Sequence, residues 1–292
     1  MPKIKINHYF HLHLLVFVWG FTAILGALIS VDAIPLVWYR MLFAVIILFL
    51  YFIYKKKSLK TTKKGILKFF ISGVIIALHW IAFFSAIKVS NVSIALVAMS
   101  TGALFTSLIE PLFFKRRLIF LELLFGLIVI AGLYLIFNVE SEYTLGIIYA
   151  LIASFLSALF TVLNGLFIKK HDAGVISFYQ LFFGVVFISI YILVSSDFTF
   201  TDFTLTSTDI FYLLILSSIC TAYAFVISVD IMKYLTPYTV MLSINLEPIY
   251  GIILAVIIFG EKEKMSPQFY VGALVILLTV LVNGILKNKK VS

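Results

Sequence analysis

Long apolar blocks, separated by short polar connections, occupy nearly the whole chain. The residues are 63% hydrophobic and only 12% charged, whereas soluble domains carry about 25% charged residues. Each block has the ~20 residues that an α-helix needs to cross a lipid bilayer. The sequence therefore predicts an all-α polytopic membrane protein with ten transmembrane helices. They are Phe10–Ile29, Pro35–Tyr54, Ile66–Ile87, Val92–Phe114, Leu118–Phe137, Leu145–Ile168, Val175–Val194, Ile210–Val229, Pro237–Phe259 and Phe269–Leu286.

Most of the 22 Lys and Arg residues gather in alternate connections between these blocks. The basic runs at 55–57, 115–117 and 169–170 fall on one side of the membrane if successive helices are antiparallel. Because Lys and Arg collect in cytoplasmic loops, both termini are predicted to be cytoplasmic. The same bias explains the net charge of +9, so no nucleic-acid partner is expected.

Several other functions lack their residues. The single cysteine, Cys220, excludes an internal disulfide and a cysteine-based metal cluster. It is predicted to be a small packing residue. No G-x-x-x-x-G-K loop is present, which excludes ATP as a direct driver. We expect no cofactor and no metal.

The two halves of the chain match in short segments, which indicates an internal repeat over residues 1–142 and 143–292. Each half holds five helices, and an odd number inverts the second copy relative to the first. Inverted repeats are typical of transporters whose binding site lies near the bilayer midplane, between the repeats. The matching pairs are Leu36–Arg40 with Ile176–Gln180, Val89–Ser93 with Leu235–Thr239, and Gly126 with Gly272.

The ninth block carries an acid and a proline near its middle, Glu247-Pro248. A charged carboxylate at that depth costs roughly 2.5–3.5 kcal/mol on insertion scales, and a proline frees a backbone carbonyl. Both features favour a helix that lines a polar cavity. In a continuous helix, Thr239, Ser243, Glu247 and Tyr250 share one face. Glu247 is expected to bind a substrate or exchange a proton; the alternative is an acid that only holds the bend.

Other polar and aromatic residues at midplane depth are substrate-binding candidates. For each, ordinary packing or a local hydrogen bond is the alternative. Under the repeat, Ser100 and Thr101 face the Glu247 segment from the fourth block. The full set of candidates is Glu247, His79, Trp80, Trp19, Thr101, Ser100, Ser243, Tyr250 and Tyr223.

Arg40 and Gln180 occupy matching positions in the two halves and are candidate gate elements. Arg40 lies close enough to the outer end of its helix for its side chain to reach the membrane interface, so an interface anchor is the alternative. With Arg40 placed there, no basic residue remains at midplane depth. That placement argues against a multiply anionic substrate.

Short motifs in a fixed order add a family resemblance. They are Trp19-Gly20, Tyr39-Arg40, the turn at 86–95, the junction at 115–132, and Glu247-Pro248 followed by Phe259-Gly260-Glu261. The chain resembles EamA-type members of the drug/metabolite transporter superfamily over about residues 10–286. Two positions depart from the pattern: Gly102 stands where proline is frequent, and Phe114-Lys115 where Gly-Glu is frequent. The bend of the fourth helix is therefore expected to differ.

The resemblance implies a secondary carrier that moves small organic metabolites, often outward, across a bacterial inner membrane. Scattered aromatic residues suit an amphipathic metabolite such as an amino acid. Coupling to a proton through Glu247 is a further hypothesis. The alternatives are a channel or facilitator, or an integral-membrane enzyme; the enzyme is disfavoured because no paired acids accompany Glu247 and His79.

Overall fold

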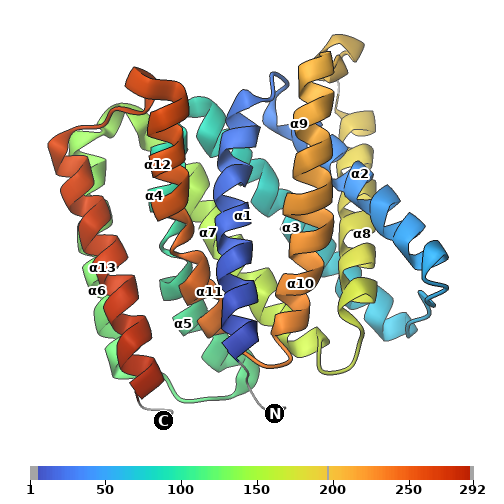
Figure 1. The fold of residues 1–292 in the computed structure, drawn as a ribbon, viewed down its shortest axis with the longest axis horizontal. Coiled ribbons are helices and arrows are strands. Elements are labelled where there is room, and N and C mark those ends of the chain that lie inside the picture. The colour runs from blue at the N-terminus through green and yellow to red at the C-terminus, as the bar shows by residue number, and fades with distance from the viewer. Residues whose placement is uncertain (1–5, 196, 290–292) are drawn as a thin grey trace.

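A computed structural model describes residues 6–195 and 197–289, which form a bundle of α-helices with no β-strand among them. Figure 1 shows that α1 begins and α13 ends at the same edge of the bundle, which we call the terminus side. The helices are α1 (Ile6–Leu28), α2 (Ala33–Tyr54), α3 (Lys63–Val89), α4 (Val92–Met99), α5 (Gly102–Phe114), α6 (Phe120–Val139), α7 (Thr144–Phe167), α8 (Ala173–Val194), α9 (Ser207–Ser217), α10 (Ala224–Ile231), α11 (Pro237–Ile244), α12 (Glu247–Phe259) and α13 (Pro267–Lys289).

Within the described residues, eight stretches are long and apolar enough to cross a membrane. Three of them combine two successive helices: α4 with α5, α9 with α10, and α11 with α12. The other two predicted crossings fall in α6 and α13, whose apolar stretches are shorter, at Leu124–Asn138 and Pro267–Thr279. The prediction of an all-helical, multi-pass membrane protein is confirmed. The count of ten crossings and the inverted repeat stay predictions.

The outer surface of the bundle is apolar, as a lipid-facing surface requires. Leu127 on α6 and Leu274 on α13 are 58% and 55% exposed. These two helices lie side by side at one edge of the bundle (Figure 1) and approach closely through Gly132 and Gly272. A Cβ atom at Gly272 would lie 2.9 Å from the carbonyl oxygen of Gly132. Small residues allow such close helix contacts in membranes.

Polar residues start the central helices. Asn91 accepts a hydrogen bond from the backbone N–H of Ile94 (2.8 Å) at the start of α4. Thr236 accepts one from the backbone N–H of Thr239 (3.2 Å) at the start of α11. Side-chain caps of this kind satisfy backbone donors that would otherwise be unpaired at a helix start.

Two central helices are interrupted, and the interruptions meet. α4 and α11 each have 8 residues, while α5 and α12 each have 13. Pro248, at the start of α12, has no N–H to continue a helix. The side-chain amide of Asn245 donates to the carbonyl oxygen of Ser100 (2.6 Å), which joins the two breaks. The interruptions therefore lie together in the bundle interior.

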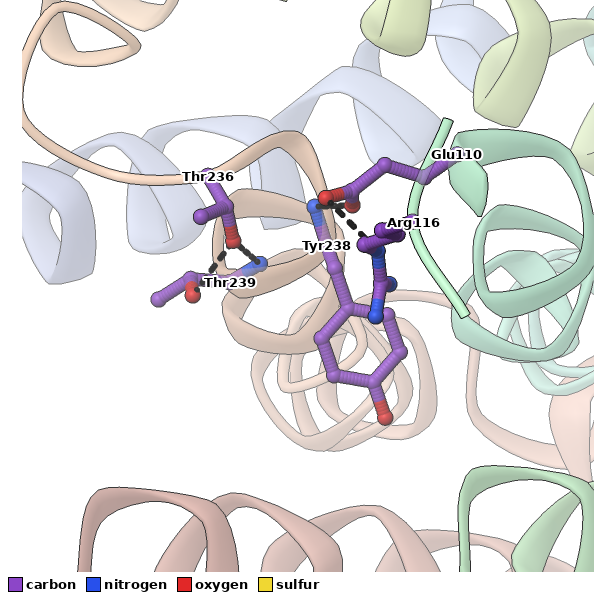
Figure 2. A network of polar contacts seen from close by, with 5 residues as sticks. All are labelled: Glu110, Arg116, Thr236, Tyr238 and Thr239. Atoms are coloured by element: carbon purple, nitrogen blue, oxygen red, sulfur yellow. Dashed lines mark hydrogen bonds and ion pairs between the residues drawn. The ribbon is translucent and has the colours of Figure 1, made fainter. Parts of the chain in front are cut away.

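A glutamate from one interrupted helix holds the start of the other on the terminus side. The carboxylate of Glu110 on α5 accepts the backbone N–H of Tyr238 (2.8 Å) on α11 and pairs with Arg116 (3.4 Å). Figure 2 shows Glu110 lying between the backbone of Tyr238 and the Arg116 side chain.

A second glutamate plays the same part on the opposite side. Glu263 follows α12, and its carboxylate accepts the backbone N–H groups of Val92 and Ser93 (both 2.9 Å) and the Ser93 hydroxyl (2.7 Å). Both carboxylates lie at a helix N-terminus, where the helix dipole stabilises negative charge. A third carboxylate, that of Asp209 on α9, accepts the backbone N–H and hydroxyl of Ser30 after α1 (both 2.7 Å).

Candidate functional site

A cavity with about 700 Å³ of space, part of it open to solvent, lies among α1, α2, α3, α4, α7, α10, α11 and α12. Its lining reaches Met232, at the terminus-side end of α10. The walls are mostly aromatic and aliphatic, with a few polar groups. The lining residues are Trp19, Thr22, Arg40, His79, Trp80, Phe83, Met99, Ser157, Phe160, Thr161, Asn164, Cys220, Phe225, Ser228, Met232, Val240, Ile244 and Glu247.

A π-helical turn, Ser218–Tyr223, joins α9 to α10 in one wall of the cavity. The wider turn disturbs the regular backbone pattern, and such turns are frequent at functional sites. Here the carbonyl oxygen of Cys220 accepts a hydrogen bond from the indole N–H of Trp19 (3.1 Å). The Thr221 hydroxyl donates to the carbonyl oxygen of Leu216 (2.6 Å). The turn thus anchors Trp19 and orients Thr221.

Arg40 points into the bundle and lines the cavity. Its Nε donates to the Thr221 hydroxyl oxygen (2.7 Å), and its guanidinium carbon lies 4.0 Å from the ring centroid of Trp80. Such a cation–π contact stabilises a positive charge over the ring face. The side chain is 1% exposed, so the alternative of an interface anchor is wrong. Because Arg40 lines the cavity, the expectation that no basic residue lies at midplane depth is also wrong.

His79 lines the same cavity and is fixed by one ring nitrogen. Its Nδ1 lies 2.8 Å from the carbonyl oxygen of Ala153 on α7. A carbonyl can only accept, so Nδ1 carries the proton. The ring is held between Phe83 and Phe160, with centroid distances of 6.3 and 5.3 Å. In the neutral ring, Nε2 is then an acceptor for a ligand donor.

Glu247 opens α12 and faces the cavity at the break in the helix. Within the part of the chain that the structure describes, no hydrogen bond or ion pair engages its carboxyl group. Arg40 lines the same cavity from α2 without forming an ion pair with it. The cavity therefore holds a cationic and an acidic group that remain separate.

Gln180 lies beside the cavity rather than in its lining. Its side-chain N–H₂ donates to the Ser72 hydroxyl (2.7 Å) and to the side-chain oxygen of Asn164 (2.6 Å). Asn164 does line the cavity. Gln180 is thus hydrogen-bonded to a lining residue, Asn164, while its predicted partner Arg40 lines the cavity itself.

The predicted substrate-binding residues separate into two groups. Glu247, His79, Trp80 and Trp19 line the cavity. Ser100, Thr101, Ser243, Tyr250 and Tyr223 do not.

The second group has identifiable local partners or surroundings. The Ser243 hydroxyl donates to the carbonyl oxygen of Thr239 (3.1 Å), and that of Ser100 to Leu96 (3.3 Å). Tyr250 packs its ring against Phe17 of α1, with centroids 5.5 Å apart. Tyr223 is 48% exposed.

The expectation that Thr239, Ser243, Glu247 and Tyr250 share one face is wrong, since α11 ends at Ile244 and α12 begins at Glu247. The rotation between successive residues is not that of one helix across the break. Glu247 faces the cavity, whereas Tyr250 faces α1.

Sequence reasoning missed part of the wall, including Phe225, Ser228 and Met232 on and after α10. Their spacing of three and four residues is helical, and Ser228 is the polar member of that stripe. That pattern was the available signal. Cys220, expected to be a packing residue, also lines the cavity.

A membrane-spanning helical bundle around a mostly apolar cavity with a few polar groups is the architecture expected of a membrane transporter. A family model matches the chain at residues 8–138 and again at 144–285. The chain belongs to the EamA-like transporter family. Its substrate is accordingly a small molecule, and its surroundings are a lipid bilayer. Membership indicates a transporter rather than an enzyme.

Two further similarities agree with this. An "Uncharacterized transporter" of Clostridium kluyveri is 23% identical over 240 residues, which cover 78% of this chain and 75% of the relative. A crystal structure of a protein superposes with a TM-score of 0.70, covering 96% of this chain and 98% of that one at 14% identity. At that identity the likeness concerns the fold alone.

Proposed function

We propose that the chain is a secondary active transporter that exports small organic metabolites such as amino acids. The observation that carries this proposal is the cavity itself, in which Glu247, Arg40 and His79 are set among aromatic walls in a membrane bundle. Aromatic and aliphatic walls accommodate an apolar body, while a few placed polar groups orient a ligand. Glu247, His79, Trp80 and Trp19 form the proposed binding surface.

Transport would proceed by alternating access. In this proposal, residues 1–142 and 143–292 are inverted five-helix repeats that rock around the cavity. The carboxylates of Glu110 and Glu263 each hold a helix start of the other half, on opposite sides of the bundle. Opening either side would require contacts of this kind to change. Arg40 and Gln180 would act as gate elements near the cavity wall.

Orientation and coupling complete the proposal. Basic connections at 55–57, 115–117 and 169–170 favour a cytoplasmic terminus side, because Lys and Arg collect in cytoplasmic loops, and we propose that the cell is bacterial. The protein then lies in the inner membrane. Glu247 has no partner among the described residues, so it is the group proposed to exchange a proton during the cycle.

Counterflow in proteoliposomes tests this function. The purified chain is reconstituted into proteoliposomes. The vesicles are loaded with one metabolite at a time from a panel of amino acids and related compounds, with and without a pH gradient. Saturable exchange between competing substrates is the expected result. A conductance that does not saturate would replace the carrier with a channel or facilitator. A pH profile of transport that is identical in Glu247→Gln would reject proton exchange at this residue.

A further inference from the structure

Arg40 has hydrogen-bonding capacity that the protein leaves unused. A guanidinium group carries five N–H donors. In Arg40, Nε donates to Thr221, while Nη1 is buried and makes no hydrogen bond. The side chain is 1% exposed and lines the cavity. An unpaired buried donor is expensive, and an uncompensated charge is more so.

Arg40 is also held in place, as a binding group would be. Its guanidinium lies between the Thr221 hydroxyl on one side and the faces of Trp80 and Phe84, at 4.0 and 5.5 Å, on others. Thr221 is itself fixed by its bond to Leu216. A preorganised planar guanidinium offers two parallel N–H groups, which match the two oxygens of a carboxylate.

We infer that Arg40 binds the anionic group of the transported molecule, and that this group is a single carboxylate. The cationic end of the same molecule faces Glu247, and its apolar body lies against Trp19, Trp80 and Phe225. The ligand class is a zwitterion with an apolar or aromatic side group. This inference rests on the proposed carrier function and adds the ligand's charge pattern and orientation.

The charges of the lining set the limit of one anionic group. Among the described lining residues, Arg40 is the permanently cationic side chain and Glu247 the acidic one. Lys88, in the last turn of α3, donates to the carbonyl oxygen of Ile29 and does not line the cavity. A ligand with two or more anionic groups would leave a negative charge unpaired in an apolar space.

Cys220 allows a test that needs no knowledge of the substrate. It is the only cysteine of the chain and lines the same cavity. The full-length protein in detergent is treated with three thiol reagents that differ in charge: anionic sulfonatoethyl, cationic trimethylammonioethyl and neutral methyl methanethiosulfonate. The rate of Cys220 modification by each is measured by mass spectrometry. Cys220→Ser gives the background.

The expected result is a ratio of anionic to cationic modification that falls about tenfold in Arg40→Gln, since charges in a cleft change local ion concentrations by that order or more. Arg40→Lys, which keeps the charge, retains most of the ratio and guards against a folding defect. Arg117→Gln removes an equal charge from an exposed loop position and leaves the ratio unchanged. An equal ratio in wild type and Arg40→Gln, or no modification by the neutral reagent, would overturn the inference.

Matched ligands complete the experiment. Phenylalanine, phenethylamine and phenylpropionate share a ring and differ in charged groups. Each is tested as a competitor of the fastest amino acid found in the counterflow panel. Arg40→Gln is expected to lower the preference for phenylalanine over phenethylamine about tenfold, equivalent to one charge-assisted hydrogen bond. Glu247→Gln is expected to lower the preference for phenylalanine over phenylpropionate.

The two measurements separate the two proposals. Amino-acid exchange with an unchanged preference in Arg40→Gln supports the carrier and overturns the carboxylate site. Charge-selective labelling that depends on Arg40, in a protein that exchanges none of the panel, supports the anion site and overturns the amino-acid carrier.

Discussion

The two interrupted helices share one backbone plan but differ in chemistry at the break. At the break between α4 and α5, the Thr101 hydroxyl lies 2.8 Å from the carbonyl oxygen of Ala98 and 2.9 Å from the Ser154 hydroxyl. At the break between α11 and α12, the carboxyl group of Glu247 faces the cavity. At the first break the polar side chain bonds within the protein, whereas at the second the carboxyl group has no hydrogen-bond or ion-pair partner among the described residues. Two helices with the same kind of interruption therefore differ in the group that they present at the break.

The largest effect should come from the second break. Glu247→Gln removes the charge that would meet a substrate ammonium group or a proton. A charge-assisted hydrogen bond contributes about 1.5–3 kcal/mol, so the rate of substrate exchange at subsaturating concentration should fall roughly 10- to 100-fold. The rate is measured by counterflow in proteoliposomes at equal protein content.

Thr101→Val is the matched change at the first break. Its hydroxyl bonds to Ala98 and Ser154 rather than facing the cavity, so exchange should stay within about twofold, the change expected without a lost charged contact. Equal losses in both variants would show that the two breaks have the same role.

The next largest effect concerns the two acids near the end of α12. Glu263 is 4% exposed and receives three hydrogen bonds at the start of α4. Glu263→Ala should lower the free energy of unfolding by about 2–3 kcal/mol, because buried backbone donors lose a charged acceptor. Thermal unfolding in detergent measures this.

Glu261→Ala is the control, since that side chain is 85% exposed and pairs with Lys264 at the surface. Its effect should stay within about 0.5 kcal/mol. If Glu261→Ala were the more harmful change, the assignment of the helix-capping acid to Glu263 would be reversed.

A smaller effect is expected at the other helix start. Glu110→Ala removes the acceptor for the backbone N–H of Tyr238 and the partner of Arg116. The loss should be about 1.5–2 kcal/mol. Glu110→Gln keeps an oxygen for Tyr238 and should recover about half of that loss. Unfolding of the two variants side by side separates the cap from the ion pair, and identical curves would argue against a cap.

The smallest effect should come from the bond that joins the two breaks. Asn245→Ala removes the donor to the carbonyl oxygen of Ser100. One neutral hydrogen bond contributes about 1 kcal/mol, so the unfolding transition should move slightly. The counterflow rate should change less than in Glu247→Gln. A loss of transport as large as that of Glu247→Gln would make the link between the breaks part of the transport cycle.

The sequence was enough to predict the apolar helices, because hydrophobic length acts locally. It pointed to a polar bend at Glu247-Pro248 but not to the break into α11 and α12, which ended the shared face expected of a continuous helix. It also selected Trp19, His79 and Trp80, which line the cavity. Arg40 was harder. Its position in α2 allows both a turn outward to the membrane interface and a turn inward. The choice depends on Thr221 and Trp80, which come from other helices.

Acids at helix ends show the same limit. The resemblance drew attention to Glu261 within Phe259-Gly260-Glu261, yet the buried acid is Glu263. Gly260 has φ +58°, so the chain changes direction there and the following residues leave the helical path. Which of two nearby acids then points inward depends on that local geometry, which composition and periodicity do not contain.

The π-helical turn Ser218–Tyr223 makes the cavity sensitive to chain length as well as to side-chain identity. A π-turn holds more residues than an α-turn, so it shifts the angular phase of everything that follows. Deleting one residue there would turn α10 by roughly 100° relative to α9. Phe225 and Ser228 would leave the wall, and other side chains of α10 would take their places. A deletion of this kind offers a short evolutionary route from one ligand preference to another.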